Sequence, residues 1–104
     1  MEKKVVYIAG PITGVENYRE AFEKAEAELT ARGCIPLSPA HLPEGMTKAQ
    51  YMRICFAMID SADAVLLLPG SIRSPGALTE YTYCNYIEKP VALNNEELEE
   101  VLKQ

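Results

Sequence analysis

The stretch DAVLLLPGSIRSPGALTEY, residues 63–81, decides the fold class of this 104-residue chain. Its first part, DAVLLLPG, is a continuous apolar run, which is typical of a parallel strand covered on both faces. Ser74 and Pro75 then predict the start of a helix. The serine hydroxyl can cap the first turn, and proline at the first helical position lacks the amide hydrogen that would have no partner there. A buried strand that leads into a helix indicates an α/β domain.

Segments with strand and helix patterns alternate along the rest of the chain. This order predicts a small doubly wound parallel sheet, Rossmann-like or flavodoxin-like, of four or five strands flanked by helices, and a single domain over residues 1–104. The second strand contains two prolines and is expected at an edge of the sheet. The expected strands are residues 3–10, 34–40, 63–70 and 90–94, and the expected helices are residues 16–33, 47–62, 74–89 and 95–104.

Composition and charge narrow the classes of function. The formal net charge of −5 argues against binding a nucleic-acid polymer, which needs a basic face, but it does not exclude a single nucleotide. No apolar run approaches the ~20 residues of a membrane span, and the apolar run at the start is too short for a signal peptide, so we expect a cytoplasmic protein without a membrane partner. The three cysteines are far apart and fit neither a disulfide framework nor a metal site.

Three flexible segments are expected to meet at one edge of the sheet. GPITG (10–14), SPAHLPEG (38–45) and PGSIRSPG (69–76) each follow a predicted strand and are rich in Gly, Pro, Ser and Thr. In an open parallel sheet, ligands bind beyond the carboxyl ends of the strands. The sequence therefore predicts a pocket formed by these three segments.

Glu80 is the candidate catalytic residue at that edge. It lies six residues after Ser74, and helical side chains lean toward the N-terminus, over the positions three and four residues back. Those positions are Ala77 and Gly76, whose small size leaves the carboxylate an open path to the strand ends. The alternative is an ordinary solvated glutamate. A carboxylate in the pocket could attack the anomeric carbon of a sugar, with no metal and no redox cofactor.

The motifs VVYIAGPITG, DAVLLLPG and SPGALTE, in this order and spacing, resemble the nucleoside 2-deoxyribosyltransferase superfamily over residues 4–93. Within it, the chain is most similar to the 2′-deoxynucleoside 5′-phosphate N-hydrolases and their short relatives, because serine stands at position 74 where transferases usually carry aspartate. The resemblance implies an enzyme, an N-glycosidase (hydrolase or deoxyribosyltransferase), that cleaves nucleoside 5′-monophosphates with Glu80 as the nucleophile.

The resemblance also implies a set of substrate-binding residues. The first-strand loop would contact sugar and base, and Ser74 at the start of the third helix, next to Gly76, would hold the 5′-phosphate. Arg73 directly precedes Ser74 and either faces the phosphate or is an ordinary exposed arginine. Asn94 follows the fourth strand, where relatives often donate groups into a neighbouring subunit's site. The residues expected to bind substrate are Tyr7, Gly10, Pro11, Ile12, Gly14, Arg73, Ser74, Gly76 and Asn94.

One departure from the family pattern keeps alternatives open. The family usually has an aspartate on the second helix that helps to protonate the leaving base, and this chain has Cys55 there. A non-catalytic nucleotide-binding module or sensor is therefore one alternative. Another is a ribonucleotide phosphoribohydrolase of the "lonely guy" type, because LLLPGSIRSPGALTE is similar to its PGG-x-GT-x-x-E signature.

The second predicted helix has almost no polar face between Tyr51 and Ile59. Such a helix is expected to be buried on more than one side. In a chain of this size the additional cover would come from a second copy, so we expect a homodimer or a higher homo-oligomer.

Overall fold

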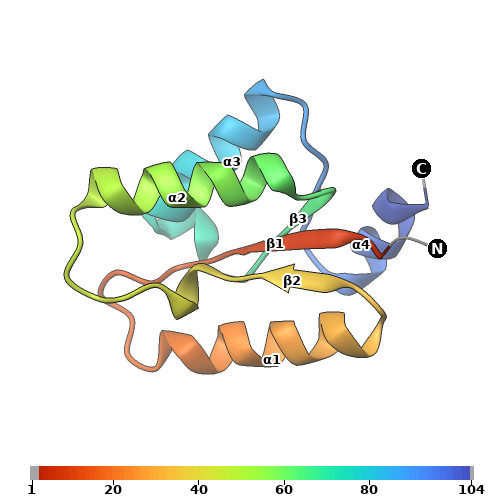
Figure 1. Cartoon of the computed structure of the whole chain (residues 1–104), viewed down its shortest axis with the longest axis horizontal. Coiled ribbons are helices and arrows are strands. Elements are labelled where there is room, and N and C mark those ends of the chain that lie inside the picture. Colours follow the sequence, from red (N-terminus) through yellow and green to blue (C-terminus); the bar gives the residue numbers. More distant parts are fainter. Residues whose placement is uncertain (1–2, 104) are drawn as a thin grey trace.

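The computed structural model describes residues 3–103 and confirms the alternating order of strands and helices (Figure 1). The Gln104 end of the predicted terminal helix lies outside the described residues. The elements are β1 (Val5–Ala9), α1 (Tyr18–Ala31), β2 (Ile35–Leu37), the 3-10 turn η1 (Pro39–His41), α2 (Lys48–Ser61), β3 (Ala64–Leu67), the 3-10 turn η2 (Ser71–Arg73), α3 (Pro75–Tyr86), β4 (Val91–Ala92) and α4 (Asn95–Leu102).

The four strands form one parallel sheet in the order β2-β1-β3-β4, which confirms the predicted α/β class. The proline-containing strand β2 lies at an edge, as expected. The chain builds outward from β1 in one direction through β2 and in the other through β3 and β4. The strand order therefore reverses between β1 and β3, and a crevice opens at their carboxyl ends.

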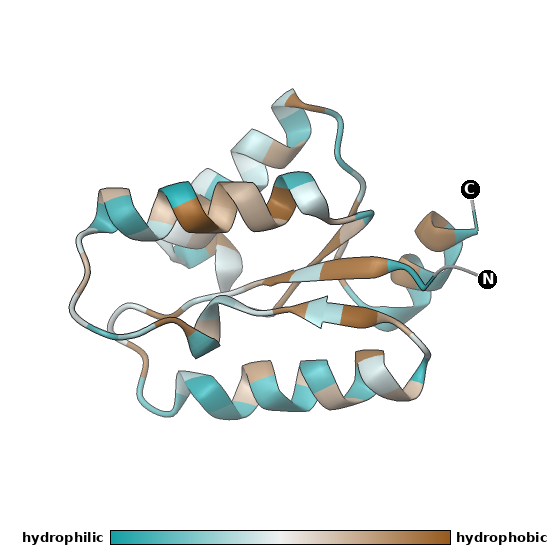
Figure 2. Cartoon of the chain, in the orientation of Figure 1, coloured by the Kyte–Doolittle hydropathy of each residue, from teal (hydrophilic) through white to brown (hydrophobic). Residues whose placement is uncertain are grey.

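Helices cover both faces of the sheet, which explains why its central strands are mainly apolar (Figure 2). Val6 and Ile8 of β1 pack with the buried residues of α1 and α4, whereas Tyr7 and Ala9 pack with Cys55 of α2 and the buried residues of α3. Side chains alternate between the two faces of a strand. A central strand with a core on each side is therefore mainly apolar on both faces, and the hydroxyl of Tyr7 on β1 is buried with a hydrogen-bonding partner.

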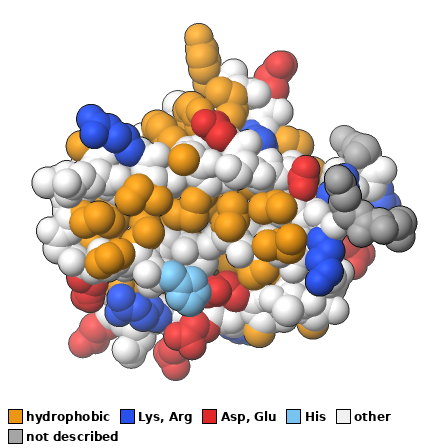
Figure 3. Space-filling view, in the orientation of Figure 1, with side chains coloured by type: hydrophobic (Ala, Val, Ile, Leu, Met, Phe, Trp, Pro, Cys, Tyr) orange, Lys and Arg blue, Asp and Glu red, His pale blue; other side chains and the backbone are white. Residues whose placement is uncertain are grey.

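Within one copy of the chain, the helix α2 is covered on the side that faces the sheet. Its buried residues are Cys55 and Ile59, while Ile54 is 37% exposed. On its α3 side, the ring of Phe56 stacks on Tyr83 with 4.2 Å between centroids. Figure 3 shows hydrophobic side chains gathered across the face on which α2 and the edge strand β2 lie. These contacts are all within one copy of the chain, so the expected homo-oligomer stays a prediction.

Within residues 3–103, no helix combines the length and the apolar character needed to cross a lipid bilayer.

Candidate active site

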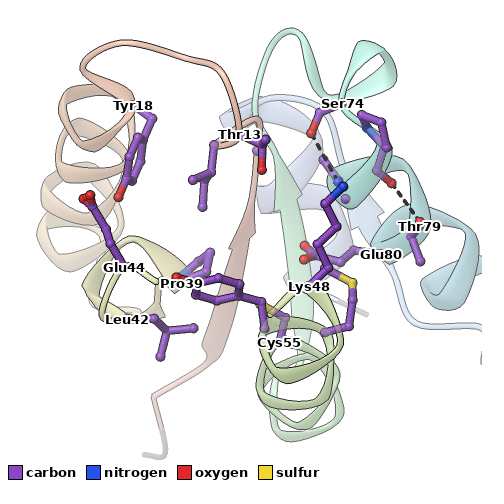
Figure 4. A pocket seen from close by; sticks show the side chains of 17 residues that line it. Thr13, Tyr18, Pro39, Leu42, Glu44, Lys48, Cys55, Ser74, Thr79 and Glu80 are labelled. Atoms are coloured by element: carbon purple, nitrogen blue, oxygen red, sulfur yellow. Dashed lines mark hydrogen bonds between the residues drawn. The ribbon is translucent and has the colours of Figure 1, made fainter. Parts of the chain in front are cut away.

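A cavity of about 450 Å³ lies beyond the carboxyl ends of β1 and β3 (Figure 4). Its lining comes from the loop after β1, the start of α1, the segment between β2 and α2, the first turns of α2 and the first turns of α3. The three segments that the sequence placed at this edge therefore meet in one cavity. A volume of this size accommodates a small molecule such as a nucleotide.

The first turn of α3 forms one wall of the cavity. Ser74 is the N-cap, and its hydroxyl oxygen accepts a hydrogen bond from the amide of Ala77 at 3.4 Å. Pro75 occupies the first helical position. At Gly76, an added Cβ would come within 3.7 Å of the Cε atom of Met52 on α2. The absence of a side chain there leaves room between the two helices in front of Glu80.

Glu80 projects from α3 into this cavity and is buried, with 5% of its surface exposed. Its Oε1 atom accepts a hydrogen bond of 2.9 Å from the hydroxyl of Tyr7, which comes from β1. Burial raises the pKa of the Glu80 carboxyl to about 7, and hydrogen bonds from Tyr7 and Cys55 oppose that rise. The carboxyl group therefore changes its charge near neutral pH, which is typical of groups at catalytic sites.

Tyr7 and Cys55 hold the carboxylate as neutral hydrogen-bonding partners. Burial, reinforced by the nearby charge of Glu80, raises the pKa of the Tyr7 hydroxyl well above its ordinary value. Burial also raises the pKa of the Cys55 thiol to about 12. Both groups keep their protons at physiological pH, so the cluster carries at most the single negative charge of Glu80.

The two ends of the cavity differ in character. At one end lie the ring of Tyr18 from α1, the apolar side chains of Pro39 and Leu42, and the carboxylate of Glu44 (Figure 4). At the other end lies the start of α3, and Lys48 extends its side chain from α2 toward Ser74 (Figure 4). The Glu80 carboxylate lies on the α3 side of the space between them.

The structure brings five of the predicted site residues to the lining of this cavity, and their roles there stay predictions. They are Gly10, Ile12, Ser74, Gly76 and Glu80. Gly10 is confined, because an added Cβ would lie 3.0 Å from core side-chain atoms. Tyr7 does not line the cavity: its side chain is buried beneath it and donates a hydrogen bond to Glu80, and its contact with a substrate stays a prediction.

Four further predicted residues do not line the cavity. Pro11 packs near the turn at Gly70, and Gly14 has a positive φ of 77° in the loop before α1. Arg73 is exposed on the one-turn helix η2. Asn94 caps α4, where its side-chain oxygen accepts a hydrogen bond of 2.8 Å from the amide of Glu97. A contribution of Asn94 to a second subunit stays a prediction.

Sequence reasoning missed Tyr18, Glu44 and Lys48 as lining residues. Lys48 had a usable signal, because Thr47 caps α2 with a complete capping box and a lysine directly after a cap lies at the mouth of a helix. Glu44 had no such signal, because it lies in an irregular segment whose path the hydrophobic pattern of the sequence does not determine.

No group of three or more His, Cys, Asp and Glu side chains within residues 3–103 is arranged to hold a metal ion.

The fold and the cavity define a small α/β domain with a cavity of nucleotide size at the carboxyl ends of its parallel strands. The structure is similar to a 2-deoxyribosyltransferase from the psychrotolerant bacterium Bacillus psychrosaccharolyticus, described as a biocatalyst for nucleoside synthesis, with a TM-score of 0.66 and 23% identity over 84% of this chain and 69% of that chain. It is similar to a 2-deoxyribosyltransferase from Leishmania mexicana, with a TM-score of 0.66 and 23% identity over 85% of this chain and 61% of that chain. At this identity the likeness shows the fold alone.

The chain belongs to the family described as domain of unknown function DUF4406, whose model matches residues 4–93. No curated protein sequence matches it.

Proposed function

We propose that this protein is an N-glycosidase that cleaves the bond between sugar and base in 2′-deoxynucleoside 5′-monophosphates, with Glu80 as the nucleophile. The observation that carries the proposal is the buried carboxylate of Glu80, which faces a cavity of nucleotide size and accepts a hydrogen bond from Tyr7. A solvated helix glutamate would have neither property. The likeness in fold to two 2-deoxyribosyltransferases supports the same class of chemistry.

The reaction would proceed in two displacements. A Glu80 oxygen forms a bond to the anomeric carbon through an oxocarbenium-like transition state, while the bond to the base breaks and the base leaves with the electron pair. Water, or a second base in a transferase, then attacks the same carbon and releases the carboxylate. Only the ionised form of Glu80 attacks, so its pKa of about 7 makes the first step depend on pH in the neutral range.

Protonation of the leaving base is the step of this reaction that the residues of the cavity support least. Cys55 lines the cavity beside Glu80, and its pKa of about 12 makes it a poor proton donor. This favours a slow enzyme, or the second candidate, a nucleotide-binding module that does not turn its ligand over. In that second case, nucleotide binding persists in a Glu80→Gln variant and the parent protein releases no base.

The test is a panel of deoxyribonucleoside and ribonucleoside 5′-monophosphates, incubated with protein at a concentration near that of the substrate, with free base followed by chromatography. We expect base release from at least one deoxynucleotide and none from the Glu80→Gln variant. Glu23→Gln, on the exposed side of α1, is the matched control and should behave as the parent does.

Failure of the parent protein to release base from any member of the panel would remove the enzymatic proposal. Release from ribonucleotides in preference to deoxynucleotides would instead favour the phosphoribohydrolase alternative. We further propose that residues 1–104 act as one domain in a homodimer or higher homo-oligomer, which sedimentation or light scattering can test.

A further inference from the structure

Lys48 is the only cationic side chain in the lining of the cavity formed by the described residues. It is the first residue of α2, and its main chain is held by the capping box that Thr47 and Gln50 form. From there its side chain runs into the cavity toward the end of α3 that carries Ser74 (Figure 4).

Lys48 is exposed to solvent where it lines the cavity, and its position at a helix N-terminus is electrostatically unfavourable. A helix N-terminus carries a partial positive charge and is stabilised by acidic side chains, not by lysine. The first turn of α2 contains no acidic residue, and Lys48 takes part in none of the ion pairs found within residues 3–103. The Glu44 carboxylate, at the opposite end of the cavity, lies 3.7 Å from the guanidinium of Arg19.

The first turn of α3 adds to this positive region. The N–H groups of the first turn of a helix point out of its N-terminus and favour an anion there. The starts of α2 and α3 thus both face the end of the cavity into which Lys48 extends. Three sources of positive potential converge at one place, and no carboxylate side chain of the described residues is paired with Lys48.

The position of Glu80 between the two ends indicates which part of a nucleotide would lie beside Lys48. A nucleotide with its phosphate beside Lys48 and Ser74 would place its sugar at Glu80 and direct its base toward Tyr18 and Leu42. The opposite orientation would bring the phosphate to the carboxylate of Glu44. Only the first orientation places the negative phosphate beside positive charge and keeps it away from the carboxylate of Glu44.

We infer that Lys48 binds the 5′-phosphate and makes the protein prefer nucleoside monophosphates to the corresponding nucleosides. This inference rests on the proposed function and adds to it the residue that supplies the cation. Arg73, which the sequence suggested for that role, does not line the cavity. A lysine that contacts a phosphate makes a charge-assisted hydrogen bond, and its loss corresponds to about 10- to 100-fold in Kd.

The experiment measures binding, so that it does not depend on turnover. The four common 2′-deoxynucleoside 5′-monophosphates and their nucleosides are titrated calorimetrically into Glu80→Gln protein with and without Lys48→Met, which keeps the length of the side chain and removes its charge. Lys48→Arg in the same background keeps the charge. Lys24→Met, on the exposed side of α1, controls for the change in net charge.

We expect the starting protein to bind at least one monophosphate tenfold or more tightly than its nucleoside. Lys48→Met should abolish that preference without weakening nucleoside binding, whereas Lys48→Arg and Lys24→Met should retain it. A preference that survives Lys48→Met overturns the role of Lys48 and leaves the proposed function intact. Equal affinity for monophosphate and nucleoside in the starting protein also overturns the inference. Binding of neither compound overturns the proposed function itself.

Discussion

Replacing Glu80 by glutamine should stabilise the protein at neutral and alkaline pH, by an amount that grows with pH. In the folded chain the pKa of this carboxyl is about 7, against 4.5 for the ordinary group. Between these values the folded state holds a proton that the unfolded state has lost, so the free energy of unfolding falls as pH rises. The penalty is almost absent below pH 4.5 and reaches its full size above pH 7.

The size of this effect follows from the two pKa values. Each pKa unit corresponds to about 1.4 kcal/mol, so ionised Glu80 lowers the free energy of unfolding by about 3 kcal/mol at pH 8 and by less than about 1 kcal/mol at pH 5. Glutamine has nearly the same shape and no charge. The stability difference between Glu80→Gln and the parent should therefore increase by about 2.5 kcal/mol from pH 5 to pH 8.

Urea unfolding followed by circular dichroism at several pH values between 5 and 8 measures this difference. With a urea dependence of about 1–2 kcal/mol per molar, the midpoint of Glu80→Gln should exceed that of the parent by more than 1 M at pH 8. Glu23→Gln should show no such trend with pH. A Glu80→Gln difference that stays constant from pH 5 to pH 8 would refute the reasoning, because it would mean that the carboxylate is solvated in the folded state.

Three further predictions concern neighbours of the carboxylate. Tyr7→Phe removes the 2.9 Å hydrogen bond to Glu80 and should raise the pKa of that carboxyl by about 1 or more, so the acid limb of the pH profile for base release should move upward; an unmoved limb would contradict the contact. Gly10→Ala places a Cβ 3.0 Å from two core side chains and should lower the free energy of unfolding by about 1–3 kcal/mol, as measured by urea titration; an unchanged midpoint would show that the core gives way. Cys55→Asp supplies a carboxyl group that can protonate the leaving base, and it should raise base release at pH 6 tenfold or more in single-turnover assays; an equal or lower rate would mean that protonation is not limiting.

The parts of the structure that local rules control could be predicted from the sequence. The helix start at Ser74 and Pro75 depends only on a capping hydroxyl and a missing amide hydrogen, and the cap at Thr47 has the same origin. The inward direction of Glu80 follows from the lean of helical side chains over Gly76 and Ala77. For this reason Glu80 could be identified from the sequence alone as the candidate nucleophile.

The parts that depend on long-range packing could not be predicted. Glu44 lies in a turn whose path depends on contacts such as the hydrogen bond of 2.6 Å from the Tyr51 hydroxyl to the carbonyl of Pro43. Arg73 follows a tight turn in which Ser71 points inward while Arg73 is exposed.

The hydrogen bond between Tyr7 and Glu80 could not be predicted for a different reason. Tyr7 alternates along β1 onto the face covered by α2 and α3, so its hydroxyl reaches Glu80 from below the cavity. The family resemblance implies that Tyr7 contacts the ligand, whereas the alternation of side chains along a strand predicts only which face of the sheet Tyr7 lies on. The depth of a side chain along a strand depends on which helices cover that face.

The most direct test of the central claim is a crystal structure of Glu80→Gln protein soaked with a 2′-deoxynucleoside 5′-monophosphate. We predict that the anomeric carbon will lie about 3–3.5 Å from the side-chain oxygen at position 80, the distance expected for atoms poised to react. A nucleotide whose anomeric carbon is turned away from position 80, or that binds outside the cavity, would contradict the account.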